Sequence, residues 1–320
     1  MEHSAPLDST AFPPLPAEAI ILTGPTASGK SSVALSIAET INAEIVSLDS
    51  IAVYRGMDIG TAKPTATDRA RVPHHLLDVV SPAEEFSVAN YLTRATQCAK
   101  DIFARGKRPL FVGGTPMYLK GLLYGFDPGP PADWEFRRAV DQDILEYGIQ
   151  ALHKRLQQVD PLSAHKLPPT DTRRITRALE VAYLTGIPIS HRQTQFESLT
   201  VDRSPKLIAI SWPRETLHKR IESRVESMFK AGLVDEVAGL LEAHQTLSRT
   251  AATAVGYREV IEHLKAGTSL KSTKQLVLFH TRQLARRQKT WFRSLPTLQC
   301  MVVDSDESLE LAKSEITQQL

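Results

Sequence analysis

The most constraining feature of the sequence is a glycine-rich loop between an apolar run and a helical pattern. The loop GPTASGKSS runs from Gly24 to Ser32 and follows the residues AIILT. Gly24, Gly29, Lys30 and Ser31 match G-x-x-x-x-G-K-[ST], in which backbone N–H groups and a helix N-terminus hold phosphate. The loop predicts a strand, a phosphate-binding turn and a helix, and it leaves open whose phosphates are bound.

Short apolar runs alternate with longer helical patterns, which predicts parallel strands joined by helical crossovers. The expected strands are AIILT, EIVSL ending at Asp49, PLFVGG, KLIAIS and CMVVD. Helices are expected over 31–40 and 87–105, with Gly106 at the C-terminal cap of the second. The fold class expected is α/β, a P-loop NTPase-like parallel sheet core flanked by helices, with a helical insertion domain.

The insertion is expected because the segment after the hinge FDPGPPAD carries helical patterns without a strand signal until Lys206. The expected regions are a flexible N-terminal tail (1–18), a first part of the core (19–127), the helical insertion (128–205) and a second part of the core with a basic helix (206–320).

Composition narrows the setting of the protein. The 38 basic residues nearly balance 36 acidic ones, so any nucleic-acid surface must be local. Two cysteines give no disulfide framework and no metal-binding spacing, which favours a reducing compartment. The first 18 residues do not resemble a targeting peptide, and apolar runs are shorter than the ~20 residues that span a bilayer. We expect a soluble, cytoplasmic protein.

The position of an acidic residue separates the possible chemistries. In most P-loop phosphotransferases a second buried strand ends in an acid that helps hold Mg²⁺. PLFVGG ends instead in Gly113, Gly114 and Thr115, and the acid Asp49 closes another strand at the rim where ligands of α/β folds bind. Asp49 and Ser50 could also cap a following helix. The two glycines suit either close approach to a ligand or a tight turn.

Basic residues gather in two helical patterns. Between residues 271 and 300 the basic positions Arg282, Arg286, Lys289 and Arg293 share one helix face, with Trp291 and Phe292 at its end. This pattern suits a phosphate backbone and unstacked bases, and equally a solvated helix face. A second cluster, DTRRITR, opens a helix of the insertion.

Two further groups are ambiguous by spacing alone. Arg220 and Arg224 share a helix face, where pairing with Glu222 or Glu226 is the ordinary explanation. The histidines of PHHLL have no partner at metal spacing and are expected to be structural.

Taken together, GPTASGKS, LDSIAVYRGMDIGTAKP, PHHLLDVVSP, FVGGTPMYLKGLL, RRITRALEV, VGYREV and TRQLARRQKTWFR resemble bacterial tRNA dimethylallyltransferases, from about Ile20 to Arg293. The resemblance implies transfer of the prenyl group of dimethylallyl diphosphate to N6 of adenosine 37, 3′ of the anticodon, in tRNAs reading codons that begin with U. Diphosphate is released. It also implies Mg²⁺ as cofactor, the tRNA anticodon stem-loop as partner, and tRNA binding by the insertion. We expect a monomer without membrane contact.

The resemblance also assigns residues. Asp49 would act on the N6 amine, and Thr115 would lie in the reaction channel. The implied diphosphate ligands are Gly24, Pro25, Thr26, Ala27, Ser28, Gly29, Lys30, Ser31, Arg220 and Arg224, with Ser31 also a metal ligand. The implied tRNA contacts are Asp49, Ser50, Ile51, Ala52, Thr115, Arg137, Arg173, Arg174, Ile175, Thr176, Arg177, Tyr257, Arg258, Arg282 and Arg286.

Three alternatives remain at this point. A kinase for a small metabolite would leave the basic and aromatic helix unexplained. An adenylate isopentenyltransferase, which acts on a free nucleotide, resembles the same core. A free nucleotide, however, offers no stem for the long insertion to bind. A non-catalytic RNA-binding protein would have no use for Lys30 and Ser31.

Overall fold

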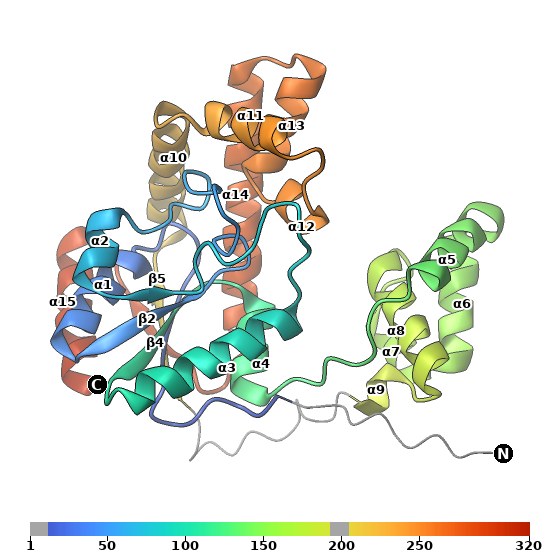
Figure 1. Cartoon of the computed structure of the whole chain (residues 1–320), viewed down its shortest axis with the longest axis horizontal. Helices are drawn as coiled ribbons and strands as arrows, with labels where there is room; N and C mark the ends of the chain where they lie inside the picture. The colour runs from blue at the N-terminus through green and yellow to red at the C-terminus, as the bar shows by residue number, and fades with distance from the viewer. Residues whose placement is uncertain (1–11, 193–204) are drawn as a thin grey trace. The chain divides into compact units, whose positions relative to one another are not determined.

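The computed structural model describes residues 12–192 and 205–320, which form two compact units. The larger unit, residues 15–123 and 205–320, is built on a six-stranded parallel sheet with the order β3-β2-β4-β1-β5-β6. Figure 1 labels β2, β4 and β5 of this sheet. The strands are β1 (Ile20–Thr23), β2 (Ala43–Leu48), β3 (His74–His75), β4 (Arg108–Gly113), β5 (Lys206–Ser211) and β6 (Gln299–Val302). The expected α/β fold and all five expected strands are confirmed.

Strand β3 is the one that the sequence did not predict, because two histidines carry no apolar run. Both histidines have structural contacts, as expected. His74 Nδ1 lies 2.8 Å from the carbonyl oxygen of Val72, and His75 Nε2 lies 2.7 Å from the carboxylate of the buried Glu44.

Every residue of β1 and β2 is buried, because helices cover both faces of the sheet. Helices α1 (Lys30–Thr40) and α15 (Asp306–Gln319) lie on one side and α3 (Val88–Ala104) on the other (Figure 1). Burial of β1 between β4 and β5 places the loop after β1 at the centre of the sheet's C-terminal edge.

Local signals set the helix ends. Ser87 and Asn90 form a capping box at the start of α3, and Gly106 follows its end with a φ of 68°. The helix expected over 87–105 is therefore confirmed. The other helices of the larger unit are α2 (Ala66–Arg71), α4 (Pro116–Tyr124), α10 (Arg214–Lys230), α11 (Leu233–Ala243), α12 (Arg249–Ala252), α13 (Tyr257–Ala266) and α14 (Leu270–Phe292).

The smaller unit, residues 12–14 and 124–192, is helical. Its helices are α5 (Trp134–Tyr147), α6 (Ile149–Val159), α7 (Pro161–Lys166), α8 (Thr172–Thr185) and α9 (Ile189–Arg192). It has its own apolar core, which includes Val140, Leu152, Leu156, Ile175 and Leu179. The last residues of the expected insertion, 193–204, lie outside the described residues.

The segment expected to be a flexible tail is partly packed. Leu15 is 5% exposed, and its backbone N–H donates to the carbonyl of Leu122 at 2.8 Å. The packed chain therefore begins before residue 19, while residues 1–11 lie outside the described part. No helix among the described residues combines the length and apolar character that crossing a membrane requires.

Candidate active site

The phosphate loop joins β1 to α1, and glycine is required at its two ends. Gly24 has a φ of 151°, and a Cβ there would lie 2.7 Å from the carbonyl oxygen of Ile210. Gly29 has a φ of 84° and precedes the first residue of α1, Lys30. Ser31 follows in the first turn and is exposed. Gly29 therefore ends the loop where α1 begins, and the first N–H groups of a helix are the ones that can bind an anion.

Side chains from elsewhere in the core hold the loop in place. Trp212 Nε1 donates to the carbonyl of Ser28 at 2.9 Å, and Arg220 Nε donates to the carbonyl of Ala27 at 3.0 Å. The Arg220 guanidinium lies 4.2 Å from the centre of the Trp212 ring and pairs with Asp306 at 2.9 Å. Arg220 therefore supports the loop from outside, and its role as a diphosphate ligand stays a prediction.

Two other cations stand beside the loop with one carboxylate. Burial lowers the pKa of Lys30 to about 8; the charge of Arg224 acts in the same direction, and Asp49 opposes it. Burial also lowers the pKa of Arg224, again opposed by Asp49. Arg224 donates to the carbonyl of Thr61 at 3.2 Å. Two partly desolvated cations facing a single acid favour the binding of a further anion.

The ordinary explanation for the two arginines of α10 is wrong. Glu222 pairs with Arg282 at 3.7 Å, and Glu226 pairs with Lys274 at 3.3 Å. Both glutamates therefore face α14, on the other side of α10 from the loop.

Asp49 and Thr115 lie at the carboxyl ends of the neighbouring strands β2 and β4. Asp49 Oδ1 accepts the backbone N–H groups of Ile51 at 2.8 Å and Ala52 at 3.2 Å. Thr115 Oγ1 accepts the N–H of Ser50 at 3.0 Å. Asp49 does cap the chain that follows it, but it caps a turn, since the next helix begins only at Ala66. These bonds use one carboxylate oxygen, so the capping does not exclude chemistry at the other.

The two glycines at the end of β4, Gly113 in the strand and Gly114 after it, are explained by close packing of the protein itself. A Cβ at Gly113 would lie 2.1 Å from the carbonyl oxygen of Leu48, and a Cβ at Gly114 would lie 2.6 Å from Gln288 Nε2. Substitution at either position would therefore force the two strand ends, or the strand and α14, apart.

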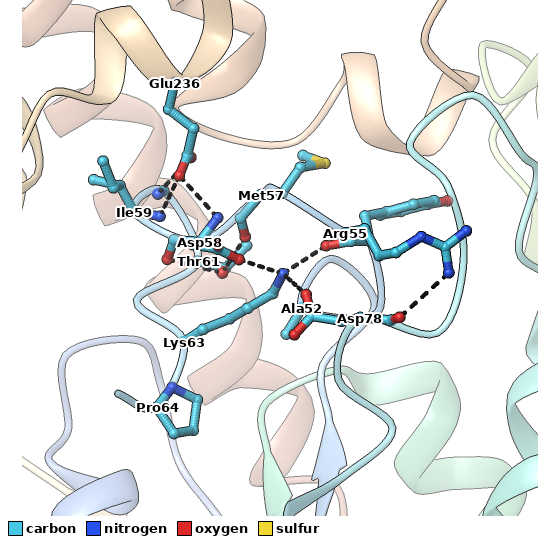
Figure 2. A network of polar contacts seen from close by, with 12 residues as sticks. Ala52, Arg55, Met57, Asp58, Ile59, Thr61, Lys63, Pro64, Asp78 and Glu236 are labelled. Atoms are coloured by element: carbon cyan, nitrogen blue, oxygen red, sulfur yellow. Dashed lines mark hydrogen bonds and ion pairs between the residues drawn. The ribbon is translucent and has the colours of Figure 1, made fainter. Parts of the chain in front are cut away.

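The loop between Asp49 and α2 is fixed by ion pairs of a buried lysine and by hydrogen bonds to a carboxylate of α11 (Figure 2). The Lys63 ammonium, whose side chain is 2% exposed, pairs with Asp58 at 2.7 Å and Asp78 at 2.6 Å. Glu236 of α11 accepts the backbone N–H groups of Asp58 and Ile59 at 2.9 and 2.7 Å. An open pocket of about 880 Å³ borders this loop, with lining residues that include Arg55, Lys63, Arg69, Arg224 and Met228. Lys63 and Glu236 are not predicted as functional residues from the sequence, because a lone lysine and a lone glutamate have no motif spacing.

The arginines of the helical unit are engaged within it. Arg137 makes a two-bonded ion pair with Glu180, both contacts at 2.8 Å, and Arg177 reaches the same carboxylate at 2.6 Å. Arg174 pairs with Asp171, whereas Arg173 is exposed. The side chains of Arg137 and Arg177 therefore stabilise the unit, and contact with RNA remains a prediction for them.

Three of the residues predicted to contact tRNA have buried side chains. Ile175 is 0% exposed in the core of the helical unit, and Ala52 is 6% exposed. Tyr257 is also 0% exposed, and its hydroxyl donates to Glu236 at 2.6 Å. These side chains do not face solvent, and contact of these three residues with tRNA stays a prediction. Arg258 remains partly exposed and pairs with Glu259 at 2.7 Å.

The basic helix α14 divides into a buried face and an exposed one. Thr273, Val277, Thr281, Ala285, Gln288 and Phe292 are buried. Arg286 and Arg293 are exposed, Arg282 is partly exposed, and Lys289 donates to the carbonyl of Trp212 at 3.2 Å. Phe292 packs inside, so the aromatic pair at the helix end leaves only Trp291 half-exposed for a base.

The chain is similar in sequence to two family models and to proteins of known name. Residues 52–295 match the family model described as IPP transferase, and residues 17–77 match that of isopentenyl transferase. The chain is 58% identical to a tRNA dimethylallyltransferase of Rhodopirellula baltica, covering 89% of this chain and 88% of the relative. It is 45% identical to one of Geobacter sulfurreducens, covering 87% and 90%.

The structure is also similar to solved structures of transferases. A tRNA isopentenylpyrophosphate transferase of Bacillus halodurans has a TM-score of 0.68 and 34% identity, over 94% of this chain and 96% of that one. A eukaryotic dimethylallyltransferase acting on tRNA has a TM-score of 0.77 and 25% identity, over 93% and 77%.

Proposed function

Because the chain belongs to the IPP transferase family, we propose that it transfers a dimethylallyl group from dimethylallyl diphosphate to N6 of adenosine 37, 3′ of the anticodon, in tRNAs reading codons that begin with U. The observation that carries the proposal is the pair of cations, Lys30 and Arg224, beside the phosphate loop, with Asp49 at the same edge of the sheet.

The donor side supplies a stabilised leaving group. As the bond between the allylic carbon and the diphosphate oxygen breaks, negative charge grows on the diphosphate. The N–H groups at the start of α1, Lys30 and Arg224 stabilise this charge without having to reorganise. Since burial already disfavours their charged forms, an anion between them relieves that cost.

The acceptor side must orient a weak nucleophile. The N6 lone pair is delocalised into the adenine ring, so the amine has to be held in line with the allylic carbon. The Asp49 carboxylate accepts one N6 hydrogen, and it takes the proton after the carbon–nitrogen bond has formed. The adenine base must leave its stack to reach Asp49 at this edge of the sheet. Extruding a base costs less free energy in a loop than in a paired stem.

Magnesium is the metal that we propose. Ser31 is exposed at the start of α1, where its hydroxyl can serve as a ligand. Mg²⁺ retains waters and binds substrate phosphates in such sites, where it supplies charge neutralisation on the leaving diphosphate. Among residues 12–192 and 205–320, no cluster of three or more His, Cys, Asp or Glu side chains forms a site by itself.

The acceptor experiment distinguishes the proposal from its alternatives. The protein is incubated with Mg²⁺ and labelled dimethylallyl diphosphate, together with undermodified tRNA, with AMP or with no acceptor. We expect label on tRNA only. Label on AMP would favour a free-nucleotide enzyme, and absence of label from tRNA would overturn the proposal.

The proposal includes a cytoplasmic, monomeric enzyme, and sedimentation of the purified protein tests whether it is a monomer.

The role of Asp49 is tested by Asp49→Asn. Asparagine keeps an oxygen that can accept the N–H groups of Ile51 and Ala52, so the turn is preserved, but it cannot take a proton. We expect transfer to fall by about 10²–10⁴-fold while the Kd for tRNA changes by less than about threefold. Turnover close to that of the unaltered protein would remove Asp49 from the chemistry.

A further inference from the structure

Gln288 is a buried polar residue on the inner face of α14, and its side chain joins two segments of the active site. It is 7% exposed. Its Oε1 accepts the backbone N–H of Thr26, in the phosphate loop, at 2.9 Å. Its Nε2 donates to the backbone carbonyl of Gly114, after β4, at 2.8 Å. One amide therefore satisfies a donor on one segment and an acceptor on the other.

The two segments carry the two halves of the proposed reaction. Thr26 belongs to the loop that holds the diphosphate. Gly114 directly precedes Thr115, whose hydroxyl accepts the N–H of Ser50, next to Asp49. The underlying strands are paired only as far as Thr23 and Gly113, so beyond that point the Gln288 amide continues the connection.

The packing is too close for this contact to be incidental. A Cβ at Gly114 would lie 2.6 Å from Gln288 Nε2 and 3.1 Å from the carbonyl oxygen of Gly24. The buried face of α14 is otherwise made of threonine, alanine and apolar side chains, such as Val277 and Phe292. A buried amide in such a face costs free energy unless both its ends are bonded, and here both ends bond to active-site backbone.

We propose that Gln288 is a positioning residue for prenyl transfer: it sets the separation between the phosphate loop and the segment of Gly114 and Thr115. It thereby aligns the allylic carbon of the donor with the nitrogen held near Asp49. This inference rests on the proposed function. A misplacement of about 1 Å between reacting groups can reduce a rate by about 10²-fold, so a single amide at this point has leverage.

The kinetic test compares one substitution at two positions of α14. Gln288→Met keeps the length of the side chain and removes both hydrogen bonds. Gln283→Met is the matched control, because Gln283 is exposed on the same helix. We expect Gln288→Met to lower kcat by about 10-fold or more, with the KM for tRNA changed by less than about twofold. Gln283→Met should behave like the unaltered protein. A purely structural role would lower the melting temperature and leave kcat of the folded enzyme unchanged.

A double-substitution cycle tests the contact itself. Gly114→Ala places a methyl group against Gln288 Nε2, so it should reduce kcat strongly in the unaltered background. In a Gln288→Ala background the 2.6 Å approach to Nε2 is gone and only the 3.1 Å approach to the carbonyl oxygen of Gly24 remains, so the added loss should be much smaller. Equal losses in both backgrounds would contradict the contact.

Hydrogen exchange provides a readout that does not depend on the reaction. Without substrate, the amide of Thr26 should exchange faster in Gln288→Met than in Gln283→Met, as measured on peptides covering the phosphate loop. Unchanged exchange together with kcat within twofold would overturn the inference. If the unaltered protein fails to label tRNA, the proposed function fails, whereas the exchange result still tests the connection. Should Gln288→Met not fold, Gln288→Glu replaces it with the same expectation for kcat.

Discussion

Two sites in this protein each combine two cations with one carboxylate, and they use these charges differently. In the helical unit, Arg137 and Arg177 both bond directly to Glu180, which is completely buried. Beside the phosphate loop, Lys30 and Arg224 lie near Asp49, whose Oδ1 accepts two backbone N–H groups. Both sets carry two positive charges and one negative charge, but in the first both cations bond directly to the carboxylate. In the second, Lys30 and Arg224 donate to the backbone carbonyls of Pro25 and Thr61 at 3.3 and 3.2 Å.

This difference teaches how a binding site is recognised among charged residues. Ion pairing fixes the geometry of the helical unit and stabilises it. At the loop, burial without full pairing costs stability in the free protein, and the proposed binding of diphosphate would recover that cost. We therefore propose that clusters that look equally basic in sequence serve stability in the helical unit and ligand binding at the phosphate loop.

Arg224→Met should have the largest effect, on the binding side of the comparison. Loss of one cation from the diphosphate site should reduce kcat/KM for the donor by about 10²–10³-fold. The melting temperature should not fall, since a poorly paired buried charge is removed. Lys219→Met, an exposed change on the same helix, is the control. A clear fall in melting temperature with little loss of activity would place Arg224 among the structural cations.

Glu180→Gln should have the opposite signature. Removing the charge leaves two arginines without their partner, and we expect the helical unit to lose about 2 kcal/mol of unfolding free energy. The arginine side chains are 28–29% exposed, which keeps the loss below that of a fully buried pair. Urea unfolding followed by circular dichroism measures it, with the exposed Glu146→Gln as control. Donor affinity should be unaffected, and a weakened donor Kd would break the distinction between the two sites.

Raising the pH should weaken donor binding at the phosphate loop and leave the ion pairs of the helical unit unchanged. The pKa of Lys30 is lowered to about 8, so the fraction that is protonated, and with it donor affinity, should fall as the pH rises above 8. Burial raises the pKa of Glu180, but hydrogen bonds from Arg137 and Arg177 outweigh this and lower it, so Glu180 stays ionised throughout. Titration calorimetry of the donor from pH 6.5 to 9.5 should show a loss of up to about tenfold per pH unit above 8. A donor Kd that is flat to pH 9.5 would contradict the lowered pKa of Lys30.

The same pKa affects folding stability in the free protein. Above pH 8 the unfolded state binds more protons than the folded state, so the contribution of Lys30 to stability rises with pH.

The sequence predicted the fold and part of the site. The strands, the phosphate loop and the capped helix α3 follow from local patterns, because glycine, serine and apolar runs act through their own backbone neighbours. The short β3 carried no such pattern. Lys63, Glu236 and Gln288 were not predicted as site residues, since their partners lie 5 to 262 positions away in the chain.

By itself, the sequence determined the glycine-rich loop between a strand and a helix, an acid at the end of the next strand, and the family motifs that accompany them; phosphate binding by this loop stays a prediction. Only the tertiary structure decided which charges are available. It buried Tyr257 and Ile175, paired Arg137 and Arg177 with Glu180, turned Arg220 to support the loop, and left Lys30 and Arg224 near a single acid. The physical reason is that the chemistry of a charged side chain depends on its desolvation and its partners, and distant segments supply both.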